Sequence, residues 1–288
     1  MTTLRFRDKV LPATGGLVMA IVNRTPDSFF DRGATFGLAA ALDRVDEVVG
    51  QGAHIVDIGG VKAAPGDEVP VAEEVRRVVE VVEAVRDRHP RVVLSVDTFV
   101  PEVADAACAA GADLVNDAWG APFARTAEVA AQHGAGLVCT HAGGLAPRSR
   151  PHRVAYDDVV GHVVTTLTGL ADRALSAGVA RESILIDPGH DFGKNSRQSL
   201  QVTARTEELV ATGWPVLMAL SRKDFVGEVL DLPPDDRLEG TLAATAVTAW
   251  LGARVFRCHD VTATLRVLAV VDALQGRRDL AVGKRGLA

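Results

Sequence analysis

A repeating unit is the feature that most constrains how this chain can fold. A short apolar run is followed by a loop rich in glycine or polar residues and then by an amphipathic run, and the unit recurs along the sequence. The apolar runs are continuous and not alternating, as expected for parallel strands covered on both faces. The predicted strands are Leu17–Val22, His54–Ile58, Val92–Val96, Leu114–Asn116, Gly136–Thr140, Ile184–Ile186, Val216–Leu220 and Val255–Cys258.

The amphipathic runs between these strands predict helices. The clearest run places valines on one stripe, with Glu and Arg on the other face, which is typical of a helix packed on a core. The stripe consists of Val71, Val75, Val78, Val79, Val82 and Val85. Similar patterns predict helices over Asp157–Ala177, Thr206–Thr212, Leu238–Leu251 and Val261–Gln275.

Eight strands, each followed by a helix or a helix-length stretch, favour an α/β fold of the (β/α)8 TIM-barrel type. An open doubly wound sheet is the alternative. The length of 288 residues suits one barrel, and the sequence contains no Pro- or Ser-rich linker, so we expect a single domain. We predict an N-terminal extension over 1–16, the barrel over 17–276 and a C-terminal tail over 277–288.

Charge and cysteine usage exclude several classes of protein. A net charge of −6 disfavours a basic nucleic-acid-binding surface. The three cysteines are far apart and form no CxxC pair, which favours reduced thiols in the cytoplasm. Apolar stretches stay shorter than the ~18 residues of a membrane span. The charged N-terminus is also unlike a signal peptide. We therefore expect a cytoplasmic protein without nucleic-acid or membrane partners.

Polar residues follow the predicted strands. The C-terminal ends of barrel strands open on one face, where active sites are assembled from several loops. A single Asp in such a place is more often a helix cap than a catalyst. Eight coincident placements indicate a site. The residues are Asn23, Asp57, Asp97, Asn116, His141, Asp187, Lys223, and Arg257 with His259.

One subset of these residues suits a flat heterocycle. Asp97 and Asp187 supply acceptors, Asn116 supplies an amide that both donates and accepts, and Lys223 supplies a cation. An aminopyrimidinone ring has matching donors and acceptors.

A second subset seeks an anion. Arg257, His259 and Asn23 form it, because the guanidinium fork matches phosphate geometry. The alternative for Arg257 is an ion pair between strands. Asp57 is interpreted as structural, holding loop backbone or pairing across the barrel, and His54 as a packed residue at the opposite end.

The ordered set of motifs resembles dihydropteroate synthase from about Val18 to Val261. The resemblance implies a barrel transferase of folate biosynthesis that joins 6-hydroxymethyl-7,8-dihydropterin pyrophosphate to p-aminobenzoate and releases pyrophosphate. It also implies a homodimer. The motifs are Asn23…Thr25-Pro26-Asp27-Ser28-Phe29, Asp57-Ile58-Gly59-Gly60, Ser95-Val96-Asp97-Thr98, Asn116-Asp117, Asp187-Pro188-Gly189…Phe192-Gly193-Lys194, Ser221-Arg222-Lys223, Gly240-Thr241-Leu242-Ala243 and Arg257…His259-Asp260-Val261.

The resemblance assigns roles by position. The pterin would be held by Asp97, Asn116, Asp187 and Lys223, of which Asp97, Asp187 and Lys223 would be catalytic. The pyrophosphate would be bound by Asn23, Arg257 and His259, with Mg²⁺ on Asn23. The second substrate would contact Phe29, Pro65, Phe192 and Ser221. Pyrophosphate would leave first, with the two carboxylates stabilising the cationic pterin before the arylamine attacks.

Three segments depart from the family pattern. The second loop usually reads Gly-Gly-Glu-Ser-Thr-Arg-Pro-Gly, and here Val61-Lys62-Ala63-Ala64 replaces the four central residues. The first loop carries Arg24, Phe30 and Arg32 where Val, Ser and Gly are usual, and His190-Asp191 replaces an apolar-Gly pair. Besides an active synthase, two alternatives therefore stay open. One is a diverged paralogue that binds pterin with weak, absent or different activity. The other is a methyltetrahydrofolate-dependent methyltransferase, which the phosphate-seeking Arg257 and His259 disfavour.

Overall fold

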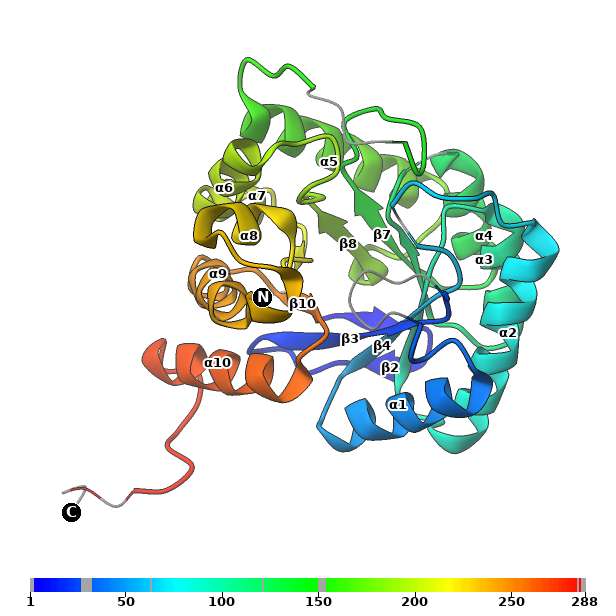
Figure 1. Ribbon diagram of the computed structural model, residues 1–288, viewed down its shortest axis with the longest axis horizontal. Coiled ribbons are helices and arrows are strands. Elements are labelled where there is room, and N and C mark those ends of the chain that lie inside the picture. The colour runs from blue at the N-terminus through cyan, green and yellow to red at the C-terminus, as the bar shows by residue number, and fades with distance from the viewer. Residues whose placement is uncertain are drawn as a thin grey trace.

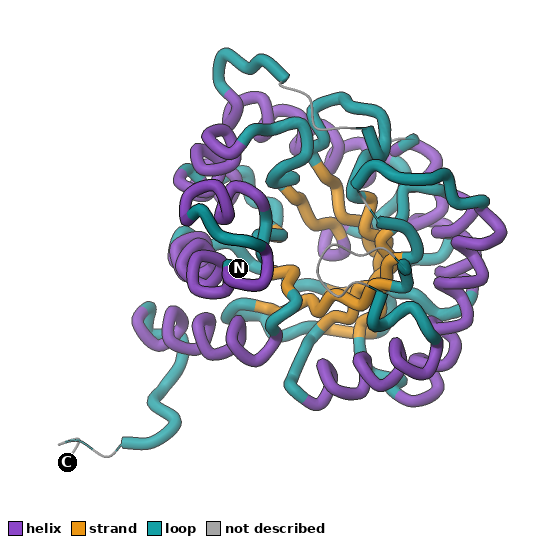
Figure 2. The backbone as a smooth tube through the Cα atoms, viewed as in Figure 1, coloured by secondary structure: helices purple, strands orange, loops and turns teal. Residues whose placement is uncertain are grey.

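Eight parallel strands form a ring in the computed structural model, which describes residues 3–26, 33–62, 64–120, 122–149, 154–283 and 285 (Figure 2). Their order is β8-β7-β6-β5-β4-β3-β10-β9, and a parallel bridge between Ile186 and Val216 joins the two ends. The (β/α)8 barrel is thereby confirmed, and the open sheet is excluded. The strands are β3 (Leu17–Asn23), β4 (Ile55–Gly59), β5 (Val93–Asp97), β6 (Leu114–Asp117), β7 (Gly136–Thr140), β8 (Ile184–Asp187), β9 (Leu217–Met218) and β10 (Val255–Cys258).

The predicted strands agree with these bounds to within a residue at each end, except for β9. The prediction there was Val216–Leu220, whereas regular pairing covers only Leu217–Met218. Prolines explain the difference, because they have no N–H to give to the ladder. Pro215 lies just before β9, and Pro188 directly follows β8, which is the strand next to β9.

Helices surround the ring of strands (Figure 1). They are α1 (Leu38–Gly50), α2 (Val71–Arg88), α3 (Pro101–Ala109), α4 (Phe123–Gln132), α5 (Val159–Ser176), α6 (Ser196–Ala204), α7 (Thr206–Val210), α8 (Asp224–Leu230), α9 (Leu238–Trp250) and α10 (Val261–Leu274), with 3-10 turns at Arg181–Ser183 and Pro234–Asp236. The buried face of α2 differs from the predicted valine stripe at both Val79 and Val71. Val79 is only partly buried, whereas Val81 is fully buried. Val71 is 43% exposed, and the buried face begins one turn later at Glu74.

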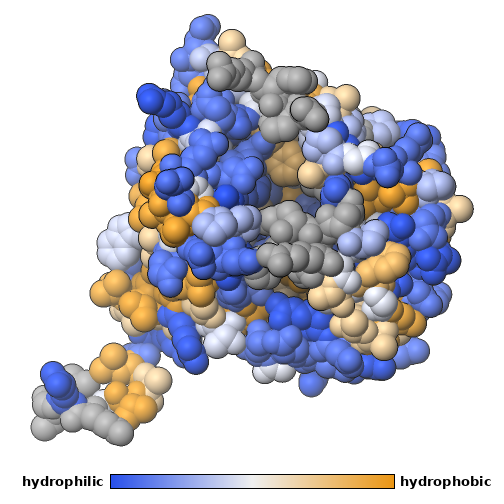
Figure 3. Space-filling model, in the orientation of Figure 1, coloured by the Kyte–Doolittle hydropathy of each residue, from blue (hydrophilic) through white to orange (hydrophobic). Residues whose placement is uncertain are grey.

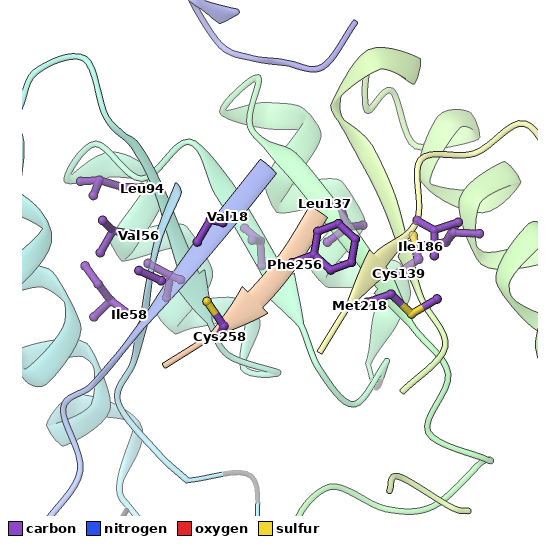
Figure 4. Packing of buried hydrophobic residues seen from close by; sticks show 14 of the residues in the cluster. Val18, Val56, Ile58, Leu94, Leu137, Cys139, Ile186, Met218, Phe256 and Cys258 are labelled. Carbon is purple, nitrogen blue, oxygen red and sulfur yellow. The ribbon is translucent and has the colours of Figure 1, made fainter. Parts of the chain in front are cut away.

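Strand side chains alternate between two apolar layers. Val18, Val56 and Phe256 belong to the large layer between strands and helices (Figure 4). The intervening residues, such as Leu17, Met19 and Val255, fill the barrel interior at its N-terminal end. Because the period is two, the next inward positions along each strand lie towards the C-terminal end of the barrel.

A small hairpin packs against the N-terminal end of the barrel. Strands β1 (Arg5–Phe6) and β2 (Lys9–Val10) pair antiparallel. The side chains of Leu4 and Phe6 are fully buried in the interior cluster. The predicted extension over 1–16 therefore contains part of the core. The division into 1–16, 17–276 and 277–288 itself stays a prediction.

The remaining sequence features have simple positions. Cys108, Cys139 and Cys258 are buried free thiols. After α10 the described chain extends away from the barrel (Figure 1). Across the ranges given above, the helices lack the length and apolar character that crossing a membrane requires.

Gly136, the first residue of β7, provides a test of the packing between hairpin and barrel. A Cβ there would lie 2.5 Å from Cδ1 of Phe6 and 2.6 Å from the carbonyl oxygen of Ser183. We expect Gly136→Ala to lower the free energy of unfolding by about 1–3 kcal/mol through overpacking. Gly169→Ala is the matched control, because a Cβ there meets nothing within 4 Å. It should raise stability by roughly 0.5–1 kcal/mol through helix propensity. Equal urea midpoints for the two variants would contradict this packing.

Candidate active site

An ion-pair network crosses the barrel interior from β10. Arg257 Nε donates to Asp57 Oδ2 at 2.6 Å, and its Nη2 donates to Asp97 Oδ2 at 2.8 Å. Burial lowers the pKa of the Arg257 guanidinium, but the carboxylates of Asp57 and Asp97 raise it by more, so the pKa lies above its ordinary value. The ion pair considered as the alternative for Arg257 is therefore present in the structure.

Asp57 is the centre of this network and is fully buried. Besides the bond from Arg257, it accepts from Ser95 Oγ at 2.5 Å and from Asn116 Nδ2 at 3.1 Å. These partners come from β5, β6 and β10, so the interpretation that Asp57 pairs across the barrel is confirmed. Ser95 was not singled out from the sequence, although its inward position follows from the period-two pattern of β5.

A cavity of about 490 Å³ lies at the C-terminal face of the barrel. Figure 3 shows this face hollowed, with hydrophilic side chains around the recess. The predicted site residues in its wall are Asn23, Pro65, Asp97, Phe192, Lys223, Arg257 and His259. Asn116, Asp187 and Ser221 are buried and do not line it, while Phe29 lies outside the described residues. The residues at the strand ends therefore form two groups: one group lines the cavity, and the other is buried and does not line it.

Burial controls the protonation of Asp97 in the cavity wall and of Asp187, which is buried and does not line the cavity. It raises the pKa of Asp97 to about 7, against the opposing field of Arg257. It also raises the pKa of Asp187, although Lys223 lowers it and the Gly189 N–H donates to its Oδ1 at 2.7 Å. A carboxyl that titrates near neutrality can both accept and give a proton.

Lys223 is held from two sides. Its ammonium donates to the carbonyl oxygen of His190 and lies 4.9 Å from the ring centre of Phe192. Burial lowers its pKa, while Asp191 and Asp187 raise it. These contacts hold the Lys223 side chain against the ring of Phe192.

A buried lysine organises the loop after β8. Lys194 Nζ donates to the carbonyl oxygens of Gly189 and Phe192, each at 3.0 Å, and lies 2.7 Å from His141 Nδ1. His141 Nε2 in turn lies 2.9 Å from His162 Nδ1. Burial lowers the pKa of Lys194 to about 7 and that of His141 to about 3. His162 is far from any strand end in the sequence, so this cluster had no signal there.

The two substituted residues of this loop have structural partners. His190 is buried, and its Nε2 lies 3.0 Å from Thr203 Oγ1. Asp191 has a φ of +67°, which explains why glycine is usual at this position. Its Oδ2 accepts from the N–H of Asp224 at 2.8 Å, at the start of α8.

Arg24 points away from the cavity. Its guanidinium donates to Glu80 Oε2 at 3.0 Å and to the carbonyl oxygens of Arg77 and Phe36. It is 3% exposed and does not line the cavity. Arg24 therefore fastens the first loop to α2 and does not replace the charge missing from the second loop.

The anion-seeking residues lie at one side of the cavity. The backbone N–H of His259 donates to Ser221 Oγ at 3.3 Å. Asn23, the last residue of β3, also lines the cavity. Burial, with the fields of Arg257 and Arg222, lowers the pKa of His259 to about 3. His259 is thus a neutral imidazole that can donate or accept a hydrogen bond.

The oxygen donors fit a metal only in part. Among the described residues, no three His, Cys, Asp or Glu side chains cluster as a metal cage. A Cβ on Gly59 would lie 3.9 Å from Asn23 Oδ1 and 3.7 Å from Asp97 Cβ, so both side chains border the same small space. Mg²⁺ commonly binds through one or two protein oxygens plus substrate phosphates. The set suits a metal ion that also takes ligands from a bound phosphate group.

The structure is thus a (β/α)8 barrel whose C-terminal face holds a cavity lined by carboxylates, cations and apolar side chains. Residues 19–259 match the family described as pterin binding enzyme. The chain is 55% identical over 276 residues to "Inactive dihydropteroate synthase 2" of Mycobacterium tuberculosis, covering 94% of this chain and 87% of that one. It is 41% identical over 260 residues to dihydropteroate synthase of Bacillus subtilis, covering 90% and 88%.

A solved structure agrees with these matches. Dihydropteroate synthase of Xanthomonas albilineans with 4-aminobenzoic acid superposes with a TM-score of 0.86 at 38% identity, covering 98% of this chain and 99% of that one. The chain belongs to the dihydropteroate synthase family of pterin-binding enzymes.

Lys194 gives a stability prediction. Lys194→Met leaves buried carbonyl oxygens without their donor, and each unpaired group costs about 1–3 kcal/mol. We expect the free energy of unfolding to fall by roughly 2–4 kcal/mol. The exposed Arg197→Met, in the first turn of α6, should change it by less than about 0.5 kcal/mol.

The same variant has a pH signature. The folded pKa of Lys194 is about 7 against 10.5 for the free side chain, so the unfolded chain binds more protons between these values. Stability from this group therefore rises with pH across that window. Methionine does not titrate, so the stability gap between wild type and Lys194→Met should widen from pH 7 to 10. If urea titrations give the same difference in free energy of unfolding at pH 7 and pH 10, burial of the Lys194 ammonium does not destabilise the folded state.

Proposed function

We propose that this protein binds a dihydropterin at Asp97 and Lys223 in the cavity wall, supported by the buried Asn116 and Asp187, and condenses it with p-aminobenzoate poorly or not at all. The observation that carries the proposal is a contrast within one cavity. The hydrogen-bond network in the barrel interior is complete at the floor of the cavity, where Asp57 is bonded to Arg257, Ser95 and Asn116. The second loop has Ala64 in the wall where the family usually has Arg.

Arg24, the first-loop arginine that the structure describes, does not replace the missing guanidinium, because it is bonded to Glu80 and the backbone outside the cavity. Lys62 is the cation that the second loop itself brings to the cavity. A lysine is a point charge and does not reproduce a bidentate fork. Losing a charge-assisted hydrogen bond costs roughly 1.5–3 kcal/mol. The loss of the family's Thr and Arg at Ala63 and Ala64 can therefore slow condensation about a hundredfold or more. The M. tuberculosis relative named inactive, at 55% identity, is consistent with this proposal.

An active synthase of folate biosynthesis is the second candidate, favoured by the 41% identity to the B. subtilis synthase. In that reaction the arylamine nitrogen forms a bond to the pterin methylene carbon, pyrophosphate leaves with the C–O electron pair, and the amine loses a proton. Asn23, Arg257 and His259 would hold the pyrophosphate. Mg²⁺, with Asn23 as its protein ligand, would neutralise that leaving group. The homodimer and the cytoplasmic location remain expectations of the family resemblance.

The condensation assay separates the two candidates. Protein, 6-hydroxymethyl-7,8-dihydropterin pyrophosphate, p-aminobenzoate and Mg²⁺ are mixed, and dihydropteroate and pyrophosphate are measured. We expect pterin binding with turnover well below about 1 per second, an ordinary enzymatic rate. Ala63→Thr with Ala64→Arg should raise turnover while leaving pterin affinity unchanged. Wild-type turnover at or above about 1 per second would establish the active synthase instead.

The pKa of Asp97 predicts how pterin binding depends on pH. Ring N–H groups need the ionised carboxylate as acceptor, and the pKa of Asp97 is about 7. The competent fraction therefore grows as pH rises, and pterin affinity should increase about tenfold between pH 6 and 8. Asp97→Asn keeps an acceptor that does not titrate, so any remaining pH dependence in that variant comes from the ligand or from other groups. Parallel pH profiles for the two proteins in a fluorescence titration would rule out Asp97 as the titrating acceptor.

A further inference from the structure

A chain of three side chains runs from the loop after β8 to the outer surface of the barrel. Lys194 Nζ lies 2.7 Å from His141 Nδ1, and His141 Nε2 lies 2.9 Å from Nδ1 of His162 on α5. Lys194 and His141 are buried, whereas His162 is exposed. We call these three residues the relay. The relay is a hydrogen-bonded path from a buried amine to solvent.

The inner end of the relay holds the aromatic wall of the cavity. Besides its bonds within the loop after β8, Lys194 Nζ donates to the carbonyl oxygen of His141 at 3.2 Å, so it ties the loops after β7 and β8 together. One of its partners is the carbonyl oxygen of Phe192, whose ring lines the cavity beside Lys223. Trp119 packs edge-on against this ring, with ring centres 4.8 Å apart. A change at Lys194 therefore reaches the cavity wall through the backbone of Phe192.

The direction of each bond in the relay follows from what an ammonium group can do. An ammonium has no lone pair, so His141 Nδ1 accepts from Lys194. Burial lowers the pKa of His141 to about 3, so this ring is neutral near pH 7 and carries its one proton on Nε2. His141 Nε2 therefore donates to the lone pair on Nδ1 of His162.

The relay has a second arrangement with the same number of protons. Lys194 gives a proton to His141 Nδ1, His141 Nε2 gives its proton to His162 Nδ1, and the positive charge moves to the exposed ring. The amine lone pair then accepts from His141 Nδ1, and His141 Nε2 accepts from His162, so both hydrogen bonds are kept. Burial lowers the pKa of Lys194 to about 7, so its proton is held weakly enough to move.

A second excess proton does not fit into the relay. With Lys194 and His162 both charged, each presents only N–H groups to His141. The neutral ring of His141 has one lone pair and accepts from one side alone, so two N–H groups face each other on the other side. The bond between His141 and His162 is then lost, and a buried N–H without a partner is costly.

The charged groups around the inner end act on the amine. Asp187 and Asp191 favour the charged form of Lys194, whereas Lys223 opposes it. The buried ring of His190 also faces these two lysines, and burial keeps its pKa well below the ordinary value, so it adds no charge.

The outer end has few ionisable neighbours. The ring centre of Tyr156 lies 5.0 Å from that of His162, and the Tyr156 hydroxyl donates to the carbonyl oxygen of Gly193 at 2.9 Å. Asp158, one turn earlier on the same helix, accepts from Arg205 at 2.8 Å. Within the described ranges, His162 has no carboxylate partner that would hold a second proton on it.

We propose that the relay is a pH-sensitive latch on the loop after β8, with His162 as the positioning residue at its outer end. One excess proton keeps the chain of hydrogen bonds continuous and the loop held. A second proton, taken up by His162 in acid, breaks the chain and loosens the loop that carries Phe192.

The sign of the pH dependence follows from the proton count. The loosened loop accommodates the second proton and the held loop does not, so the loosened state binds more protons and the loop is held more tightly as pH rises. Histidine normally changes charge between pH 5 and 8, which sets the range of the transition. The latch is a property of the free protein and does not depend on which ligand the cavity takes.

The test is hydrogen exchange of the Phe192 N–H, which donates to the carbonyl oxygen of Gly189 at 3.0 Å within the loop. Protection factors, corrected for the intrinsic pH dependence of exchange, are measured by NMR on the full chain at pH 7.5 and 5.5. We expect the wild-type protection of this N–H to fall about tenfold on acidification, the effect of one lost hydrogen bond. The N–H of Leu94, which donates to the buried Asp113 at 2.9 Å, reports opening of the whole barrel and should not change.

Two variants separate the hydrogen bond from the titration. In His162→Gln a side-chain oxygen accepts from His141 Nε2 at both pH values, so protection should stay at the neutral wild-type level. In His162→Leu the acceptor is missing, so protection of the Phe192 N–H should be about tenfold lower at both pH values and should not depend on pH.

His133→Gln is the matched control, because His133 lies just after α4 with its Nε2 bonded to Asp105, and it should reproduce the wild-type profile. Identical pH profiles for wild type and His162→Gln would overturn the proposal. So would full protection of the Phe192 N–H in His162→Leu at pH 7.5. A parallel loss of protection at Leu94 would show that the barrel as a whole responds to acid, which also overturns it.

Discussion

The guanidinium of Arg257 is the charge on which the interior of the barrel depends. It links Asp57, which is fully buried, to Asp97 in the cavity wall. Removing one partner of a buried ion pair typically costs about 3–5 kcal/mol, because the other charge is left uncompensated. The same bonds position Asp97 towards the cavity. Stability and ligand recognition therefore share one side chain, and a ligand that binds Arg257 must compete with or extend an existing pair.

The cavity is built from two parts that depend on different bonds. Its floor is held by side chains on strands, whose hydrogen bonds run among Asp57, Ser95 and Asn116. Its rim is held by loop contacts, such as those that Arg148 makes with the second loop. The bonds named here share no residue, so these loop contacts can change without breaking the hydrogen bonds among Asp57, Ser95 and Asn116. This separation explains how a chain can keep a family's pocket while departing from its loop motifs.

The fold and the position of the site could be predicted from sequence because both follow from periodicity. Continuous apolar runs mark strands between helices, and the polar residues after them meet at one face. The inward residues within strands, such as Ser95, required the register of the barrel, which apolar runs alone do not reveal. The aromatic wall of Trp119 and the partnership of Lys194 with His162 depend on contacts between distant loops. Arg24 shows the same limit, because its direction is set by Glu80 and not by its place after a strand.

The contacts of the β1–β2 hairpin impose an order on folding. The Arg5 carbonyl oxygen accepts from Ser183 Oγ at 2.5 Å, across 178 positions, and that of Pro12 accepts from Arg254 across 242. The hairpin segment thus acquires these partners only after the 178 to 242 positions that separate them have been synthesised. Contacts of such separation close slowly, because the entropy of a long loop is lost before they form. Until then the apolar side chains of Leu4 and Phe6 stay exposed, and exposed apolar surface makes an incompletely folded chain prone to aggregation.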